Sequence, residues 1–224
     1  MIEVCDVTHS FGERVVLRSV SVTLTERRIA VIGANGSGKS TFARLLNGLV
    51  APDAGRVSVH GASTAHDAAA VRRMVGFVFT DPDAQIVMPT VSEDVAFGLR
   101  KRRLGKDKLE RLVAEAIERM GLSDHAEHPA HLLSGGQKQL LALTSVLVTE
   151  PRILVCDEPT TLLDLPNTRR VLELIDALPQ QVVMVTHDLQ AVAGYDRALV
   201  FHEGRLVADD APGPAVKFYQ ALVT

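Results

Sequence analysis

The sequence predicts an α/β protein with a parallel sheet, an N-terminal antiparallel β subdomain and an inserted α-helical subdomain. Three observations lead to this prediction. Short, wholly apolar runs alternate with helical segments before residue 46 and again after residue 150, a pattern typical of parallel strands covered on both faces. The first strands, by contrast, alternate apolar and polar side chains. Residues 85–145 have helical periodicity and no strand pattern.

Length and composition are those of one large globular domain. With 224 residues, 46% of them hydrophobic and 23% charged, the chain can bury a sizeable core. The net charge of −3 gives no support to nucleic-acid binding. We find no apolar run of the ~18 residues that span a bilayer and no secretory signal. Two cysteines far apart in the sequence suit a reducing compartment, so a cytosolic protein is expected.

The first half of the chain is predicted to contain mostly strands, with two helices and a final loop. Two antiparallel strands separated by residues 11–13 precede an apolar strand at 29–32 and a helix at 42–46. Turn residues then precede a strand at 56–61. The remaining expected elements are a helix at 63–74, a buried strand at 75–79 and a loop at 80–89.

The second half is predicted to be helical first and then to return to strands. Apolar residues recur every three or four positions from residue 91 to about residue 122, with helix starts near Ser92 and Lys106. The elements expected after them are helices at 137–148, 166–178 and 188–194, strands at 153–156, 182–185 and 197–201, and a short tail at 212–224. Residues 85–145 are thus expected as a helical subdomain between core segments 1–84 and 146–224.

Residues 33–41 are the most informative stretch. They read Gly-Ala-Asn-Gly-Ser-Gly-Lys-Ser-Thr between a predicted strand and a predicted helix, the context that the phosphate-loop pattern requires. Glycines let backbone N–H groups curl around phosphate oxygens, and the helix adds its positive end. Lys39 is placed to reach the outer phosphates and Ser40 to bind Mg²⁺. The predicted nucleotide-binding residues here are Asn35, Gly36, Ser37, Gly38, Lys39, Ser40 and Thr41.

Three later stretches of the sequence indicate which class of phosphate-loop protein this is. Leu-Ser-Gly-Gly-Gln at residues 133–137 is followed by an apolar strand that ends in Asp157 and Glu158, and then by His187. This ordered set resembles the ATP-binding cassette (ABC) ATPases over nearly the whole chain. The resemblance implies an ATPase that binds ATP with Mg²⁺ and couples hydrolysis to transport across a membrane.

The two carboxylates are expected at the carboxyl edge of the sheet, where open α/β folds bind ligands. Asp157 ends a buried strand and is expected to hold Mg²⁺ through water. Glu158 is expected to polarise the attacking water, and such general-base assistance is typically worth ~10²–10⁴-fold in rate. An acidic turn with no catalytic role is the structural alternative.

Four further residues match positions of the family's nucleotide site. The resemblance implies that His187 contacts the terminal phosphate and orients Glu158. It implies that Gln85 senses Mg²⁺ and the attacking water, and that Phe11 stacks on adenine with Val16 nearby. Core packing is the alternative for Phe11.

A second anion site is expected where Ser134, Gly135, Gly136 and Gln137 open a helix. In the family this site meets the ATP held by the opposite subunit, so the resemblance implies a second ATPase subunit, with a homodimer favoured. Asp164 matches the loop that crosses the interface. Leu162 and its neighbours depart from the family here, because leucines stand at 162 and 163, where small residues are common, and at 165, where proline is frequent.

Residues 80–98 look like the corresponding segment of energy-coupling-factor (ECF) ATPases, which drive bacterial uptake of vitamins, cobalt or nickel. The resemblance implies a transmembrane coupling protein that docks near residues 85–98, in a groove suited to helices, and a separate membrane protein that binds the substrate. It also implies a peripheral position on the cytoplasmic face of the inner membrane. An ordinary loop covering the core is the alternative. The compact length is most like the biotin-transport ATPase.

Two other function classes agree less well with the sequence. A soluble, non-transport ABC ATPase of translation or DNA repair usually has two cassettes or long coiled-coil insertions, and neither is present. A phosphate-loop kinase is disfavoured by Glu158 and by residues 133–137.

Three smaller features of the sequence have simple structural interpretations. Basic residues at 100–103, 106 and 108 indicate a solvated helix face or, in a lobe that faces the membrane, contact with lipid phosphates. His125, His128 and His131 are interrupted by Pro129 and are read as linker residues rather than metal ligands. Residues 26–28 lack the glycine common before the first core strand and are read as a neutral turn variant.

Overall fold

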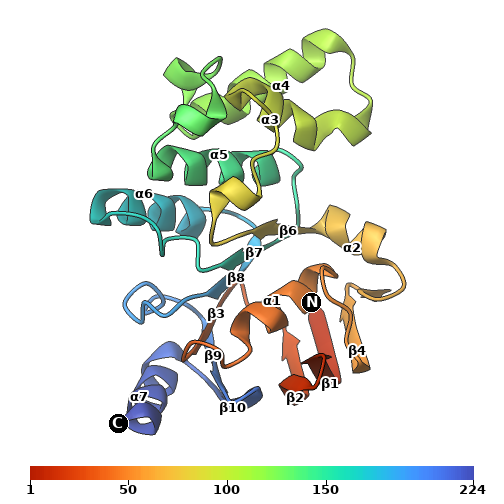
Figure 1. Cartoon of the computed structure of the whole chain (residues 1–224), viewed down its shortest axis with the longest axis vertical. Coiled ribbons are helices and arrows are strands. Elements are labelled where there is room, and N and C mark those ends of the chain that lie inside the picture. Colours follow the sequence, from red (N-terminus) through yellow and green to blue (C-terminus); the bar gives the residue numbers. More distant parts are fainter. The chain divides into compact units, whose positions relative to one another are not determined.

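The computed structural model describes residues 1–224, which divide into two compact units (Figure 1). The first unit comprises Met1–Val75, Arg152–Glu158 and Pro179–Thr224. The second comprises Gly76–Pro151 and Pro159–Leu178. The predicted subdomain boundaries at residues 85 and 145 stay a prediction.

An antiparallel sheet forms the N-terminal part of the first unit, as predicted. Its strand order is β2-β1-β4-β5. Buried side chains alternate along β1 because successive residues of a strand point to opposite faces. The four strands are β1 (Ile2–Phe11), β2 (Arg14–Leu24), β4 (Ala54–Val59) and β5 (Ala62–Ser63).

The second sheet of this unit has the order β10-β9-β3-β8-β7 and is parallel except for β10. Val185 of β8 is paired with Val31 of β3 on one side and with Asp157 of β7 on the other. The carboxyl ends of β3, β7 and β8 therefore meet at one edge. The strands are β3 (Arg28–Gly33), β7 (Ile153–Asp157), β8 (Gln181–Val185), β9 (Arg197–His202) and β10 (Arg205–Asp210).

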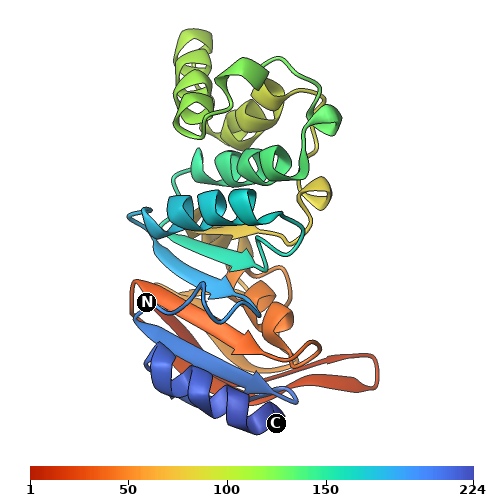
Figure 2. The same ribbon diagram turned by 90° about the vertical axis from the view of Figure 1, so that its left-hand side faces the viewer.

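Three helices accompany these sheets: α1 (Lys39–Asn47), α2 (Ala68–Met74) and α7 (Pro212–Val223). The rings of Phe42 on α1 and Phe201 on β9 lie 4.9 Å apart and are fully buried, so they anchor the helix to the sheet. Figure 2 shows α7 running along β9 and β10. The prediction of a short tail at 212–224 missed this helix, and β10 was also missed.

Two helix predictions in this unit need correction. The helix expected from residue 63 begins at Ala68, because Ala62 and Ser63 pair with β4 instead. The helix expected at 188–194 is wrong, since the segment forms turns. There the Asp188 carboxylate accepts hydrogen bonds from the N–H groups of Gln190 and Ala191, at 2.9 and 3.4 Å. Aspartate side chains offer the backbone this alternative to a helix.

The second unit is mainly helical, as predicted. It contains α3 (Val91–Leu99), α4 (Lys106–Arg119), α5 (Gly135–Leu147) and α6 (Leu165–Asp176). The strand β6 (Val75–Val78) begins on the last residue of the first unit and continues into the second. Short 3₁₀ turns connect the helices, at Pro82–Ala84, Arg100–Arg102, Ser123–His125 and Ala130–Leu132.

Helix α3 begins one residue before the predicted start. Thr90 is the N-cap and forms a capping box with Glu93, in which each side chain accepts a hydrogen bond from the other residue's backbone N–H. None of the helices has both the length and the apolar character needed to cross a membrane.

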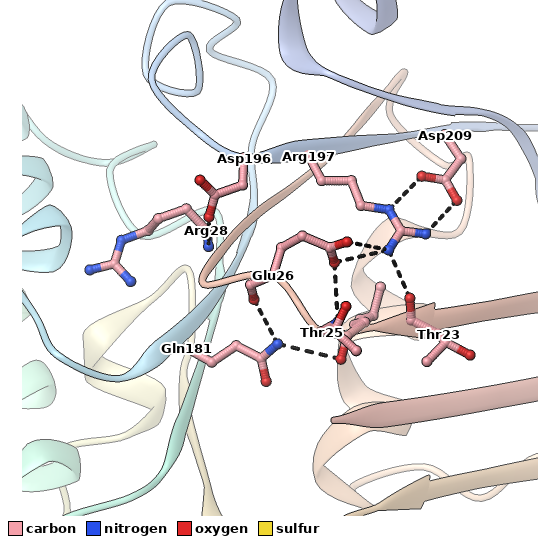
Figure 3. Close-up of polar contacts among 9 residues, drawn as sticks. Thr23, Thr25, Glu26, Arg28, Gln181, Asp196, Arg197 and Asp209 are labelled. Atoms are coloured by element: carbon pink, nitrogen blue, oxygen red, sulfur yellow. Dashed lines mark hydrogen bonds and ion pairs between the residues drawn. The ribbon is translucent and has the colours of Figure 1, made fainter.

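The turn before β3 is held by a polar cluster around Arg197 (Figure 3). The Arg197 guanidinium donates to both carboxylate oxygens of Glu26, at 2.9 and 3.1 Å, and to both of Asp209, at 2.6 Å each. It also donates to the Thr23 carbonyl at 2.8 Å. Burial raises the pKa of Glu26, but backbone hydrogen bonds and Arg197 outweigh burial and lower it overall. Glu26 is therefore an anchor rather than a neutral variant.

Candidate nucleotide site

The predicted phosphate loop connects β3 to α1 and requires glycine at two crowded positions. Gly33 has φ 148°, and a Cβ on it would lie 2.2 Å from the Phe201 carbonyl oxygen. Gly38 has φ 104°, and a Cβ on it would lie 2.8 Å from the Leu17 side chain. L-residues rarely adopt such φ values, so any other residue would strain the loop.

Lys39 is the first residue of α1, and its buried side chain points back into the phosphate loop. Its Nζ donates to the carbonyl oxygens of Gly33 and Ala34, at 2.8 and 3.0 Å. Burial lowers the pKa of Lys39, and the nearby charges of Glu158 and Asp157 oppose that shift. The buried Ser37 Oγ has no hydrogen-bond partner. A buried ammonium and an unpartnered hydroxyl inside a glycine loop fit a phosphate group.

Asp157 lies beside this loop, as its place at the end of β7 predicted. The Ser40 hydroxyl donates to Asp157 Oδ1 at 2.8 Å, and Arg44 Nη2 lies 3.8 Å from Oδ2. Burial raises the pKa of Asp157, although Ser40 and Arg44 counteract it. Hydroxyl and carboxylate oxygens are ligands that Mg²⁺ prefers. The donor set therefore fits this ion, with Ser40 and Asp157 as its protein groups.

Glu158 and His187 form a contact pair at the same edge of the sheet. Glu158 Oε2 lies 2.5 Å from His187 Nδ1. Glu158 has φ 53°, and its N–H donates to the Val185 carbonyl at 2.9 Å. A left-handed conformation costs a residue with a side chain about 1–2 kcal/mol. Such strain concentrates at functional sites because the surrounding structure enforces it.

A polar cleft of about 750 Å³ opens beside the loop, and Gly36, Val16 and Arg14 help to line it. Phe11 is half-exposed, with its ring edge-on to His9 at 4.8 Å. Sequence reasoning missed Arg14, whose Nη2 lies 3.7 Å from the position of a Cβ on Gly36. The only sequence signal for it was a cation next to the predicted adenine-contacting stretch.

The other predicted site residues belong to the second unit. The Gln85 amide is held at both ends, because its Oε1 accepts from the Phe79 N–H and its Nε2 donates to the Ala142 carbonyl, each at 3.2 Å. Val87 nearby is 61% exposed. The structure thus gives Gln85 partners within its own unit.

Residues 134–137 open α5 as predicted. Ser134 is the N-cap, with its Oγ accepting from the Gln137 N–H at 3.3 Å and its own N–H donating to Gln137 Oε1 at 2.8 Å. A Cβ on Gly136 would lie 2.3 Å from the side chain of Asn167 on α6. Gly136 therefore allows the start of α5 to approach α6.

Asp164 is the N-cap of α6. Its Oδ1 accepts from the Asn167 N–H at 3.0 Å and from the Asn167 side-chain amide at 2.7 Å. Leu162 and Leu165 flank it, and each is 62% exposed. The departures noted in the sequence thus present apolar side chains to the surface.

The structure brings Lys39, Ser40, Asp157, Glu158 and His187 together in the first unit. A glycine loop between a parallel strand and a helix, with two carboxylates at the adjoining strand end, defines a phosphate-loop nucleotide-binding protein.

Comparison with known proteins gives the family. A family model described as ABC transporter matches residues 17–161. A Deinococcus radiodurans protein named as an ABC transporter ATP-binding protein is 54% identical over 224 residues, covering 100% of this chain and 99% of that one. The biotin transport ATP-binding protein BioM of Rhizobium etli is 48% identical, covering 95% of each chain. The cobalt import ATP-binding protein CbiO of Syntrophus aciditrophicus is 41% identical, covering 95% and 79%.

Solved structures of ABC transporter subunits have the same fold as this chain. The cbiO1 subunit of Clostridium perfringens, part of an ABC transporter complex, has a TM-score of 0.85 at 28% identity, covering 99% of this chain and 92% of that one. A dimeric post-hydrolysis state of the cassette MJ0796, bound to ADP and Pi, has a TM-score of 0.83 at 26% identity, covering 95% and 99%. This chain belongs to the ABC transporter family, as an ATP-binding subunit. It is an ATPase whose hydrolysis of ATP is coupled to transport.

Proposed function

We propose that this chain hydrolyses ATP to power an ECF-type importer. The main support for ATP hydrolysis at this site is the 2.5 Å contact between Glu158 and His187. The Ser40–Asp157 hydrogen bond supports it further. The buried Lys39 and the loop N–H groups hold the phosphates, with Asn35, Gly36, Ser37, Gly38 and Thr41 in the same loop. Phe11 and Val16 contact the adenosine end.

Ser40 and Asp157 would hold Mg²⁺, with Asp157 acting through water. When bound, the ion offsets phosphate charge and orients the terminal phosphate. Glu158 accepts a proton from the attacking water, and His187 keeps the Glu158 carboxylate in place. The short contact and the enforced φ of Glu158 support these roles.

The chain works as a dimer, for which a homodimer is the simplest form. Ser134, Gly135, Gly136 and Gln137 meet the ATP of the opposite subunit, and Asp164 lies in the contact between subunits. The open N-terminus of α5 supports this role, because its first N–H groups have no partner within the helix. The dimeric form of the related cassette also supports it.

Glu158→Gln tests the chemical assignment. Glutamine keeps the shape but cannot accept the proton, so ATPase activity of the assembled transporter should fall by ~10²-fold or more. ATP should still bind, and a stable ATP-bound dimer should accumulate in size-exclusion chromatography. Hydrolysis close to the parent rate would refute the role of Glu158. Glu118→Gln, an exposed change on α4, is the matched control.

A transmembrane coupling protein docks near residues 85–98. A groove of about 560 Å³ between α3 and α4 supports this proposal, since Ala96, Val113 and Ile117 give it an apolar lining. Three exposed glutamates, Glu93, Glu110 and Glu127, also line it. An apolar groove with acidic residues suits an amphipathic helix that carries basic side chains.

Copurification tests the docking. Ala114 is exposed and lines the groove. Ala114→Arg adds bulk and positive charge on a helix that accepts arginine readily, and it should abolish copurification with the coupling protein. Glu118→Arg lies on the same helix outside the groove and should copurify normally. Equal copurification of both variants would place the docking site elsewhere.

The importer includes a separate membrane protein that binds the substrate, with this chain on the cytoplasmic face of the inner membrane. Biotin is the favoured substrate because the match to the biotin transport relative is closer and covers more of that protein than the match to the cobalt import relative. Uptake of labelled biotin should stop when Lys39→Ala replaces the parent chain. Unchanged biotin uptake with lost cobalt or nickel uptake would reassign the substrate.

A further inference from the structure

His125 contacts the residue that caps the start of α5. It lies in the turn Ser123–His125, and its Nε2 is 2.9 Å from Gln137 Nε2. The other end of the same amide, Gln137 Oε1, accepts the Ser134 N–H at 2.8 Å. One glutamine side chain therefore joins a histidine ring to the helix N-terminus.

The polarity of these contacts determines the tautomer of His125. A backbone N–H can only donate, so Gln137 must present its oxygen to Ser134 and its NH₂ group to His125. The NH₂ group is a donor, and His125 Nε2 must therefore be an unprotonated acceptor. The ring proton of neutral His125 then lies on Nδ1. That atom is buried and has no hydrogen-bond partner.

A second ring restricts His125 from the side. The His128 ring lies 5.0 Å away, centroid to centroid, with the planes at 45°. The two backbones are also linked, because the His128 N–H donates to the His125 carbonyl at 2.9 Å. The turn thus holds the imidazole with Nε2 facing Gln137.

We propose that His125 is a positioning residue for the nucleotide-contacting start of α5, acting through Gln137. Its acceptor nitrogen keeps the Gln137 oxygen turned toward the Ser134 N–H. With that N–H and the Gln137 N–H both satisfied by the capping box, the N–H groups of Gly135 and Gly136 and the Ser134 hydroxyl proton stay available for a terminal phosphate. This inference rests on the proposed role of residues 134–137.

Nitrogen-15 NMR of the nucleotide-free full chain tests the tautomer without reference to that role. At pH 8, the ring nitrogens of His125 should show Nδ1 protonated and Nε2 unprotonated. Gln137→Glu removes the NH₂ donor and should release this preference. An Nε2-protonated His125 in the parent chain would overturn the proposal.

Two variants separate positioning from simple packing. Glutamine can place its side-chain oxygen where Nε2 lies, whereas the shorter asparagine reaches only the position of Nδ1. His125→Gln should therefore keep ATPase activity of the assembled transporter within about twofold of the parent. His125→Asn should lower kcat about fivefold, the rate equivalent of one hydrogen bond, with little change in KM for ATP.

The outcomes are distinguishable from failure of the proposed function. Equal activity of the two His125 variants would overturn the positioning role. If Ser134→Arg leaves ATPase activity unchanged, residues 134–137 do not meet ATP and the proposed function fails at that point, while the NMR result still decides the tautomer.

Discussion

Asp157 carries a buried carboxylate that the nucleotide-free chain stabilises only in part. It is 1% exposed, and burial raises its pKa despite the hydrogen bond from Ser40. The native state therefore holds the Asp157 proton more tightly than the unfolded state does. Stability that is present below the unfolded pKa is lost as pH rises through the folded pKa.

Asp157→Asn should accordingly stabilise the nucleotide-free chain at neutral pH by about 1 kcal/mol, which is within the range of single stabilising substitutions. The same change should impair hydrolysis. Asparagine still accepts from Ser40 but carries no charge. The gain should shrink as pH falls through the raised folded pKa of Asp157, because the parent carboxyl then becomes protonated and uncharged. Urea unfolding from pH 4 to 8 measures it, and a pH-independent difference would contradict the argument.

Arg14 is the cation that lines the cleft next to the phosphate loop. Arg14→Ala should weaken ATP binding roughly tenfold or more, because one hydrogen bond to a charged phosphate is worth ~1.5–3 kcal/mol. Arg73→Ala, an exposed change on α2, should leave the Kd unchanged. Fluorescent-nucleotide titration distinguishes the two, and equal Kd values would remove Arg14 from the site.

Among the elements, α5 and α6 depend on each other at their N-termini. Gly136 has no room for a side chain because Asn167 fills the space, while Asn167 in turn donates to Asp164. Gly136 is expected to contact the ATP of the opposite subunit, and Asp164 is expected in the contact between subunits. Asn167 therefore connects these two parts of the proposed dimer interface.

Gly136→Ala should destabilise the chain by about 1–3 kcal/mol, the usual effect of overpacking. Adding Asn167→Ala, which removes the obstructing side chain, should recover part of that loss. Thermal unfolding of the two single variants and the double variant measures the coupling. Strictly additive losses would show that the two residues do not compete for space.

Within the whole molecule, the first unit is tied together by Arg197. This side chain joins the turn before β3 to β9 and β10 through Glu26 and Asp209, which are far apart in the sequence. Each carboxylate is bound through two contacts, a geometry that lysine cannot reproduce.

Arg197→Lys should lower the free energy of unfolding by about 1–3 kcal/mol. Lys217→Arg, on the exposed side of α7, is the control and should have no effect. Because the pKa of Glu26 is lowered in the folded chain, its contribution is present above the unfolded pKa and is lost as pH falls through the folded pKa. The Arg197→Lys loss should therefore shrink as pH falls through the folded pKa of Glu26. A loss that stays constant over that range would contradict the argument.

Local patterns determined the phosphate loop, the strands before Asp157 and His187, and the cap of α5 at Ser134. These features depend on residues close together in the sequence, such as the glycines of residues 33–41 and the box formed by Ser134 and Gln137. The edge strand β10 and helix α7 were missed because their weakly patterned residues acquire structure by packing on β9. The expected helix after His187 failed because the Asp188 side chain takes the local backbone donors.

The sequence by itself thus determined the fold class, the family resemblance and the order of the candidate site residues. Only the tertiary structure decided that Arg14 lies beside Gly36, that Glu26 is bound by Arg197, and that His125 contacts Gln137. The physical reason is that these contacts join residues separated along the chain. Periodicity and capping report neighbours within a few residues, whereas such contacts exist only once the strands and turns have packed.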